Sequence, residues 1–316
     1  MDAKECISAI SQTASQHLNL VVKPETAVWI NGPSLGHSVA DSTLVFSISG
    51  ARSSGDFVVL LSNDDFPDAV KEAVGNARGI AGELPPDLAM HVLTPLCADE
   101  WDGKSFAVYR RLYSFSENRL IAKLQKQTYG DRIYSWLARV ARETSQVVAG
   151  EDQKKMRYLD PLEYLVQEPK LSGEIAGAAA SIRSAVEADE WTPVTVVEHG
   201  DFWLGNVLLP KYWLFDSRRD RFAIIDWGGA KRTGYPFIDL IRYFRATSNN
   251  LAVLERRLTQ YCGVSNLPYA HVSRYVYSAL GAIGMNRNQF PLDRYISLVE
   301  DCTGALNSLC ADPADR

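Results

Sequence analysis

The sequence predicts an α+β fold with a β-rich N-terminal lobe and a mostly helical C-terminal lobe. Before about residue 110, runs rich in β-branched and aromatic residues alternate with Gly- and Ser-rich turns. From residue 116 onward, most apolar residues recur at three- and four-residue spacing. Because 316 residues exceed a typical single domain, we expect one lobe at residues 1–110 and a second at residues 111–316.

The N-terminal lobe is expected to combine two helices with five strands. Helical spacing predicts a first helix at residues 4–18, and Pro67 in a first turn marks a second helix at residues 66–81. A loop is expected at residues 32–38. The strands are predicted at residues 27–30, 44–48, 57–61, 89–93 and 106–109.

The C-terminal lobe is expected to be built from helices around a few short strands. The helices are predicted at residues 117–127, 130–148, 172–188, 236–248, 250–262, 267–284 and 291–310. The strands are predicted at residues 194–198, 206–209 and 222–227.

Composition and charge exclude several classes of protein. The net charge of −5 argues against a nucleic-acid partner, because such surfaces are basic. No apolar run reaches the length that a membrane-spanning helix needs, and the first residues lack the features of a signal peptide. The five cysteines form no close pair, which favours reduced thiols and a cytoplasmic location over disulfides or zinc. Oligomeric state is not predicted.

The most informative stretch is His199-Gly200-Asp201 followed by Asn206, with Asp226 twenty residues further on. An Asp and an Asn five residues apart, with a second Asp on the next hairpin, suit Mg²⁺-dependent phosphoryl transfer. Asp201 would accept the proton of an attacking hydroxyl, although a turn-forming Asp is the alternative. Asn206 and Asp226 would hold Mg²⁺ with hard oxygen ligands, the alternatives being a loop amide and a strand-end Asp.

These segments resemble the aminoglycoside phosphotransferase and choline kinase-like family. The resemblance rests on three ordered blocks, which are His199-Gly200-Asp201 with Asn206, Ile225-Asp226-Trp227, and Gly234-Tyr235-Pro236-Phe237-Ile238-Asp239-Leu240. It implies a bilobal protein-kinase-like fold and transfer of a phosphoryl group from ATP or GTP, with Mg²⁺, to the hydroxyl of a small molecule. Outside residues 190–245 the resemblance is one of layout.

The resemblance also assigns supporting roles. His199 is grouped with Asp201 in the catalytic loop, and a structural role is favoured over proton transfer because Asp201 already supplies the base. Asp239 would accept hydrogen bonds from the catalytic-loop backbone, the alternative being a first-turn acid that complements a helix dipole. Tyr109 would begin the segment bordering the adenine. From its residue type alone, Trp203 would stack on a sugar ring or a base or would pack in the core, and Tyr235 has the same two interpretations.

The expected phosphate-covering loop contains Gly32, Ser34 and Gly36, whose backbone N–H groups would contact the nucleotide. Kinases also place a basic residue on the third strand, but residues 57–62 contain none. We therefore expect another cation to reach the phosphates, the alternative being that Mg²⁺ carries the whole neutralisation. The candidates are Lys71, Arg52 and Lys104.

From Asp226 to the end, the sequence contains ten Lys and Arg residues and eight acidic residues. This balance favours a neutral or anionic acceptor over a polycationic aminoglycoside. The alternative function is a kinase-fold pseudoenzyme that binds nucleotide or a partner protein without turnover. The absent third-strand cation favours this alternative, and the intact Asp201, Asn206 and Asp226 oppose it.

Overall fold

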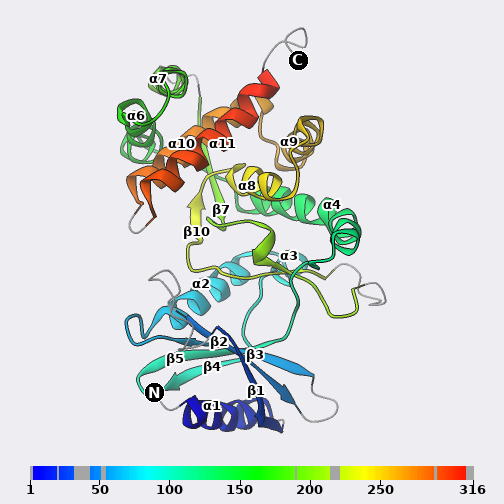
Figure 1. Ribbon diagram of the computed structural model, residues 1–316. Helices are drawn as coiled ribbons and strands as arrows, with labels where there is room; N and C mark the ends of the chain where they lie inside the picture. The colour runs from blue at the N-terminus through cyan, green and yellow to red at the C-terminus, as the bar shows by residue number, and fades with distance from the viewer. Residues whose placement is uncertain are drawn as a thin grey trace. The chain divides into compact units, whose positions relative to one another are not determined.

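The computed structural model describes residues 3–19, 21–31, 43–50, 55–188, 191–213, 221–287 and 290–310 (Figure 1). The chain divides into two compact units. The first consists of Met1–Ser114 with Val207–Gly229, and the second of Phe115–Asn206 with Ala230–Arg316.

The first unit is built on a five-stranded antiparallel sheet with the strand order β1-β2-β3-β5-β4. Its elements in chain order are α1 (Ala3–Leu18), β1 (Val22–Asn31), β2 (Thr43–Gly50), β3 (Asp56–Ser62), α2 (Ala69–Glu83), α3 (Pro86–Ala89), β4 (Cys97–Trp101), β5 (Lys104–Arg110), β8 (Val207–Leu208) and β9 (Ala223–Ile224).

The two faces of this sheet are covered by different helices. Alternate side chains of β3, such as Phe57 and Val59, are buried in one core cluster with Ile10 of α1. Leu60, which points to the opposite face, packs in a second cluster with Val70 of α2. This alternation is the period-2 pattern of a strand buried on both sides.

The segment 207–229 belongs to the first unit because its backbone is hydrogen-bonded there. Strand β8 pairs with β9, and Leu209 forms an isolated bridge with Tyr113. The backbone N–H of Leu93 donates to the carbonyl oxygen of Ile224 at 2.9 Å. Asp226 therefore follows the short strand pair β8–β9, which is part of the first unit.

The second unit is mostly helical around a three-stranded sheet of order β10-β7-β6. Its elements are α4 (Arg119–Thr144), β6 (Gln146–Val147), α5 (Glu151–Lys154), a π-helical turn η1 (Lys155–Leu159), α6 (Asp160–Gln167), α7 (Gly173–Glu187), β7 (Val194–Glu198), η2 (Leu204–Asn206), β10 (Lys231–Gly234), α8 (Ile238–Thr247), α9 (Leu251–Ser265), η3 (Tyr269–His271), α10 (Val272–Met285) and α11 (Leu292–Cys310).

Two close contacts organise the core of this unit. Gly281 of α10 faces the backbone of Pro161 in α6 so closely that a Cβ atom would overlap the Pro161 carbonyl. Tyr158, Trp191 and Tyr275 form a buried cluster of edge-to-face rings, in which centroids lie 4.9–6.3 Å apart. Helices α6 and α10 are thus packed at backbone contact beside a rigid aromatic core.

The predicted fold class is confirmed, since a β-rich N-terminal part is followed by a mostly helical C-terminal part. The strand predicted at residues 89–93 is wrong. Pro86 starts the short helix α3, and Val92 makes only an isolated bridge with Ile224. The true strand β4 escaped prediction because Cys97–Trp101 is a polar edge strand.

The helices predicted at residues 117–127 and 130–148 form the single helix α4. Asn118 caps it by accepting hydrogen bonds from the N–H groups of Leu120 and Ile121 at 3.0 and 3.3 Å. Gly130 lies in its interior without breaking it, since tertiary packing outweighs the propensity of one glycine. Among the described helices, none is long and apolar enough to cross a bilayer.

Candidate active site

The predicted catalytic loop follows β7 in the second unit. All residues of the run Val194–Val197 are β-branched, and all but Thr195 are apolar; the run forms the central strand of the small sheet. Gly200 then adopts a φ of +83°, a conformation that glycine accepts without steric cost. The loop ends in the 3₁₀ turn η2, which contains Asn206.

Asp239 fixes the start of this loop from helix α8. Its carboxylate accepts the backbone N–H of His199 at 2.7 Å and that of Gly200 at 3.2 Å. The predicted supporting role of Asp239 is therefore confirmed. Burial raises the pKa of Asp239 to about 6, although these two hydrogen bonds and the nearby Arg242 guanidinium oppose the shift.

Backbone strain accompanies the placement of Asp239. Phe237, two residues before it, has a φ of +69°, which side-chain-bearing residues seldom adopt. Its ring lies 4.6 Å from that of Tyr261 and is buried. Such a residue costs about 1–3 kcal/mol and persists only where packing holds it.

Arg242 orients Asp201, a role that the sequence did not predict. Its guanidinium forms an ion pair with the Asp201 carboxylate and donates a second hydrogen bond to the carbonyl oxygen of Gly200. Arg242 lies three residues after Asp239, so both side chains leave the same face of α8. One turn of one helix thus holds the carboxylate and the backbone of the loop.

Asn206 and His199 complete the internal bonding of the loop. The Asn206 amide donates to the backbone oxygen of Asp201 at 2.8 Å and to its Oδ2 at 3.4 Å. The Nδ1 atom of the buried His199 ring lies 3.3 Å from the backbone nitrogen of Asp201, whose N–H donates to it. His199 therefore fixes the loop backbone, as the structural interpretation predicted.

Beneath the loop, Glu198 joins β7 to the hairpin strand β10. Its buried carboxylate accepts the backbone N–H of Tyr235 at 2.8 Å and lies 3.6 Å from the Lys231 ammonium. Burial raises the pKa of Glu198, and Lys231 opposes the shift. Gly234 faces Glu198 so closely that an added Cβ would overlap the glutamate side chain. In the sequence, a charged Glu at the end of a mostly apolar strand indicates that Glu198 has a buried partner.

Asp226 lies in the first unit, two residues beyond the end of β9. It is exposed and has a φ of +64°, a strained conformation that is common at functional turns. The buried Trp227 indole N–H donates to the carbonyl of Ile224 at 2.9 Å, and Asn76 of α2 donates to the carbonyl of Gly228 at 3.2 Å. The turn bearing Asp226 is thereby fastened to α2.

The structure describes only some of the residues that were predicted to contact the nucleotide. Gly32, Ser34 and Gly36 lie outside the described residues. Tyr109 lies on β5, and burial raises its pKa to about 12, opposed by the nearby positive charge of Arg78. Arg78 is an exposed residue of α2.

Strand β3 contains no basic residue, as its sequence indicated. Of the candidate substitutes, Lys71 lies 3.0 Å from a carboxylate oxygen of Glu100, and Lys104 lies 2.8 Å from one of Asp64. Arg52 lies outside the described residues. Arg78, which lies on the same helix as Lys71, forms no ion pair with any described residue.

The two aromatic candidates differ in exposure. Tyr235 is buried, and its hydroxyl donates to the carbonyl of Arg157 at 2.5 Å, as expected of a core residue. Trp203 is 48% exposed, and its indole lies directly over Gly205. Trp203 is thus the one of the pair that is accessible to solvent.

A family model described as the phosphotransferase enzyme family matches residues 45–271. A search of curated proteins returned no match.

The solved structures that match this chain include a phosphotransferase and a kinase. One is a spectinomycin phosphotransferase in complex with ADP and spectinomycin, at 13% identity and a TM-score of 0.45, covering 94% of this chain and 98% of the other. Another is an ethanolamine kinase of Plasmodium vivax, at 10% identity and a TM-score of 0.49, covering 97% of this chain and 88% of the other.

Proposed function

We propose a specific reaction for this chain, which belongs to the phosphotransferase enzyme family and is a small-molecule phosphotransferase. The reaction is transfer of the γ-phosphoryl group of ATP or GTP to the hydroxyl of a small hydroxylated metabolite. The observation that carries the proposal is the bonding of Asp201, which α8 and Asn206 hold at the turn after β7.

In this proposal Asp201 is the catalytic base. Its carboxylate accepts the proton as the acceptor oxygen attacks the γ-phosphorus and the bond to the β,γ-bridging oxygen breaks. A strong base is unnecessary, because most of the barrier reduction comes from positioning and charge neutralisation. Arg242 serves as a positioning residue for Asp201, and Asp239 positions the backbone on either side of Gly200.

Asn206 and Asp226 are the proposed Mg²⁺ ligands. Amide and carboxylate oxygens suit this ion, which usually takes few protein ligands and fills its octahedron with water and phosphate oxygens. Bound there, Mg²⁺ would neutralise charge on the phosphates. The Asn206 amide nitrogen already donates to Asp201, which leaves its carbonyl oxygen for a metal.

Arg78 is the proposed replacement for the third-strand cation. It belongs to α2, the helix that is bonded to the Asp226 turn through Asn76, and its charge acts on Tyr109 of β5. Lys71 and Lys104 instead hold carboxylates of their own unit. A nucleotide triphosphate brings up to about four negative charges, more than one Mg²⁺ cancels, so a further cation is expected at the phosphates.

The pseudoenzyme alternative is not favoured, since the family and the intact loop both support turnover. We place the reaction in the cytoplasm, because the described cysteines Cys6, Cys97, Cys262 and Cys302 carry free thiols, as is usual in a reducing compartment.

A nucleotide-consumption screen tests the proposal. Wild-type protein with Mg²⁺ and ATP or GTP is incubated with sugars, sugar phosphates, choline-like alcohols, aminoglycosides and nucleosides. Asp201→Asn keeps the shape of the side chain and removes the base, so turnover should fall about 10²–10⁴-fold while nucleotide affinity stays near that of wild type. Unchanged turnover in Asp201→Asn would refute the base assignment. Failure of the wild type to bind either nucleotide would refute the proposed reaction.

A further inference from the structure

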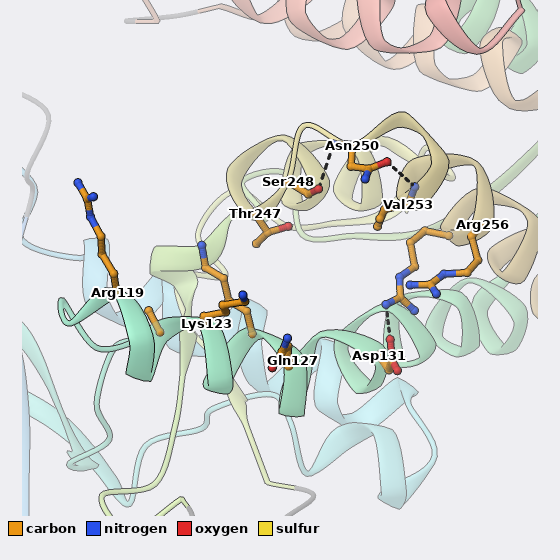
Figure 2. A pocket seen from close by; sticks show the side chains of 12 residues that line it. Arg119, Lys123, Gln127, Asp131, Thr247, Ser248, Asn250, Val253 and Arg256 are labelled. Atoms are coloured by element: carbon orange, nitrogen blue, oxygen red, sulfur yellow. Dashed lines mark hydrogen bonds and ion pairs between the residues drawn. The ribbon is translucent and has the colours of Figure 1, made fainter.

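The second unit contains a basic cavity of about 920 Å³ between the N-terminal half of α4 and the segment 247–257, which runs from the end of α8 into α9 (Figure 2). This volume is typical of a small-molecule site. Five of its lining side chains are cationic and one is acidic. The cationic ones are Arg119, Lys123, Lys126, Arg256 and Arg257, and the acidic one is Asp131.

The single carboxylate is already neutralised. Asp131 forms an ion pair with Arg257, whose guanidinium also lies 4.6 Å from the centre of the Tyr134 ring. Arg257 is only 8% exposed, and its Nε atom is buried without a hydrogen-bond partner. The other four cations of the cavity form no ion pair with any residue in the described part of the chain. The basic cavity therefore has a large positive charge that the protein does not balance.

The placement of three of these cations is unfavourable for the helix itself. Arg119, Lys123 and Lys126 lie at positions i, i+4 and i+7, so they form a row on one face of α4. Like charges at this spacing repel each other, and cations near a helix N-terminus oppose the helix dipole. No acidic residue occupies the first turn of α4 to offset them. A bound anion would relieve both repulsions at once.

Hydroxyl and amide groups complete the cavity wall. Figure 2 shows Thr247, Ser248 and Asn250 opposite the row on α4. Asn250 already caps α9, since its side-chain oxygen accepts the N–H groups of Ala252 and Val253 at 3.0 and 3.4 Å. The cationic side chains, rather than the helix N-terminus, would therefore bind the ligand.

Helix α8 contacts both the catalytic loop and the basic cavity. Thr247 ends α8 five residues after Arg242, an axial rise of about 7.5 Å. The Thr247 hydroxyl lies 3.4 Å from that of Tyr134, whose ring packs edge-to-face on Tyr243, which in turn packs on Phe202 beside Asp201. The cavity and the proposed base thus belong to one packed body.

We propose that the basic cavity binds the anionic end of the phosphoryl acceptor, a small hydroxylated molecule that carries a phosphate or several carboxylates. The acceptor role rests on the proposed function, whereas anion binding does not. The match lies in the chemistry, since guanidinium and ammonium groups are the side chains that bind phosphate and carboxylate groups most strongly.

The binding test uses inorganic pyrophosphate as the probe and calorimetry as the readout, at about 50 mM and about 200 mM salt. Lys123→Gln/Arg256→Gln removes two cations of the cavity. Lys155→Gln/Arg294→Gln is the matched control, because it removes one Lys and one Arg from exposed positions of the same unit outside the cavity. The cavity variant should lose affinity at least about tenfold and the control should not. Thermal melting should show the cavity variant to be as stable as the wild type, since the replaced cations hold no carboxylate.

Failure of the wild type to bind pyrophosphate, or an equal loss in both variants, overturns the anion site. The acceptor role is tested in the nucleotide-consumption screen, where the cavity variant should raise KM for a phosphorylated acceptor at least about tenfold and keep kcat. An uncharged preferred acceptor whose KM is unaffected overturns that role. If the wild type consumes no nucleotide yet binds pyrophosphate through the cavity, the anion site stands and the proposed function fails.

Discussion

Replacement of Asp239 by asparagine should separate the stability of the fold from the order of the catalytic loop. The wild-type carboxylate has two oxygens, one for the N–H of His199 and one for that of Gly200. Asparagine retains a single acceptor and turns an NH₂ group toward the second N–H. Leaving a buried donor without an acceptor costs about 1–3 kcal/mol.

An opposing term acts on the whole fold. Burial raises the pKa of Asp239 from 3.8 to about 6, which corresponds to about 3 kcal/mol against the ionised carboxylate at neutral pH. Asparagine carries no charge and removes this cost. Since this net cost already allows for the two hydrogen bonds to the loop, the free energy of global unfolding at neutral pH should not fall and should rise by up to about 3 kcal/mol.

The loop should respond differently, because the relief of desolvation restores no acceptor for its N–H group. Hydrogen exchange of peptides covering residues 196–206 should accelerate about 5- to 140-fold, the equivalent of 1–3 kcal/mol, and turnover should fall with it. Asp293→Asn is the matched control, since Asp293 is a first-turn acid of α11 that does not touch the loop. Loop exchange at the wild-type rate in Asp239→Asn would refute the reasoning, as would equal acceleration in both variants.

Three further outcomes are expected. Gly234→Ala should lower the melting temperature and reduce the free energy of unfolding by about 1–3 kcal/mol, because the new Cβ overlaps Glu198. Gly177→Ala in α7, where a Cβ meets no neighbour, should be neutral or stabilising. Equal melting temperatures of the two variants would count against the contact between Gly234 and Glu198. The stability contributed by Asp239 is fully present below its ordinary pKa of 3.8 and is lost as the pH rises through about 6. The value of kcat should change in the opposite direction and fall below about pH 6, because protonation of Asp239 removes an acceptor from the loop. A kcat profile that is flat down to pH 5 would contradict this. Arg78→Gln should weaken nucleotide binding, measured by calorimetry, by about 1.5–3 kcal/mol, with partial recovery in Arg78→Lys; wild-type affinity would remove Arg78 from the phosphate site.

Local signals predicted much of the fold and part of the candidate site. The strand at residues 194–198 and the loop after it could be predicted because a β-branched run, a glycine and a short motif lie side by side in the sequence. The support from Asp239 was predicted from its motif, and the hydrogen bonds to the loop confirm it. The roles of Asn206 and Asp226 toward a metal remain predictions.

The rest depended on contacts between residues far apart in the chain. Arg242 follows Asp201 by 41 residues, and only the packing of α8 beside the loop brings them together. The cations of the basic cavity come from α4 and α9, which pack on each other although more than a hundred residues separate them. Neither segment has a periodicity that indicates its partner. The polar strand β4 was missed for a different reason, since an edge strand needs no apolar pattern.

The position of Trp203 over Gly205 gives the catalytic loop an intrinsic optical signal. All seven tryptophans lie in the described part of the chain, and Trp203 is the only exposed one among them. Its emission should therefore be the most red-shifted and the most accessible to a collisional quencher such as iodide. A ligand that covers the loop would shield this indole from the quencher. Trp136, Trp191 and Trp227 are buried, so the quencher would not reach them with or without the ligand. Steady-state fluorescence can thus follow occupancy of the loop without a label or a coupled reaction.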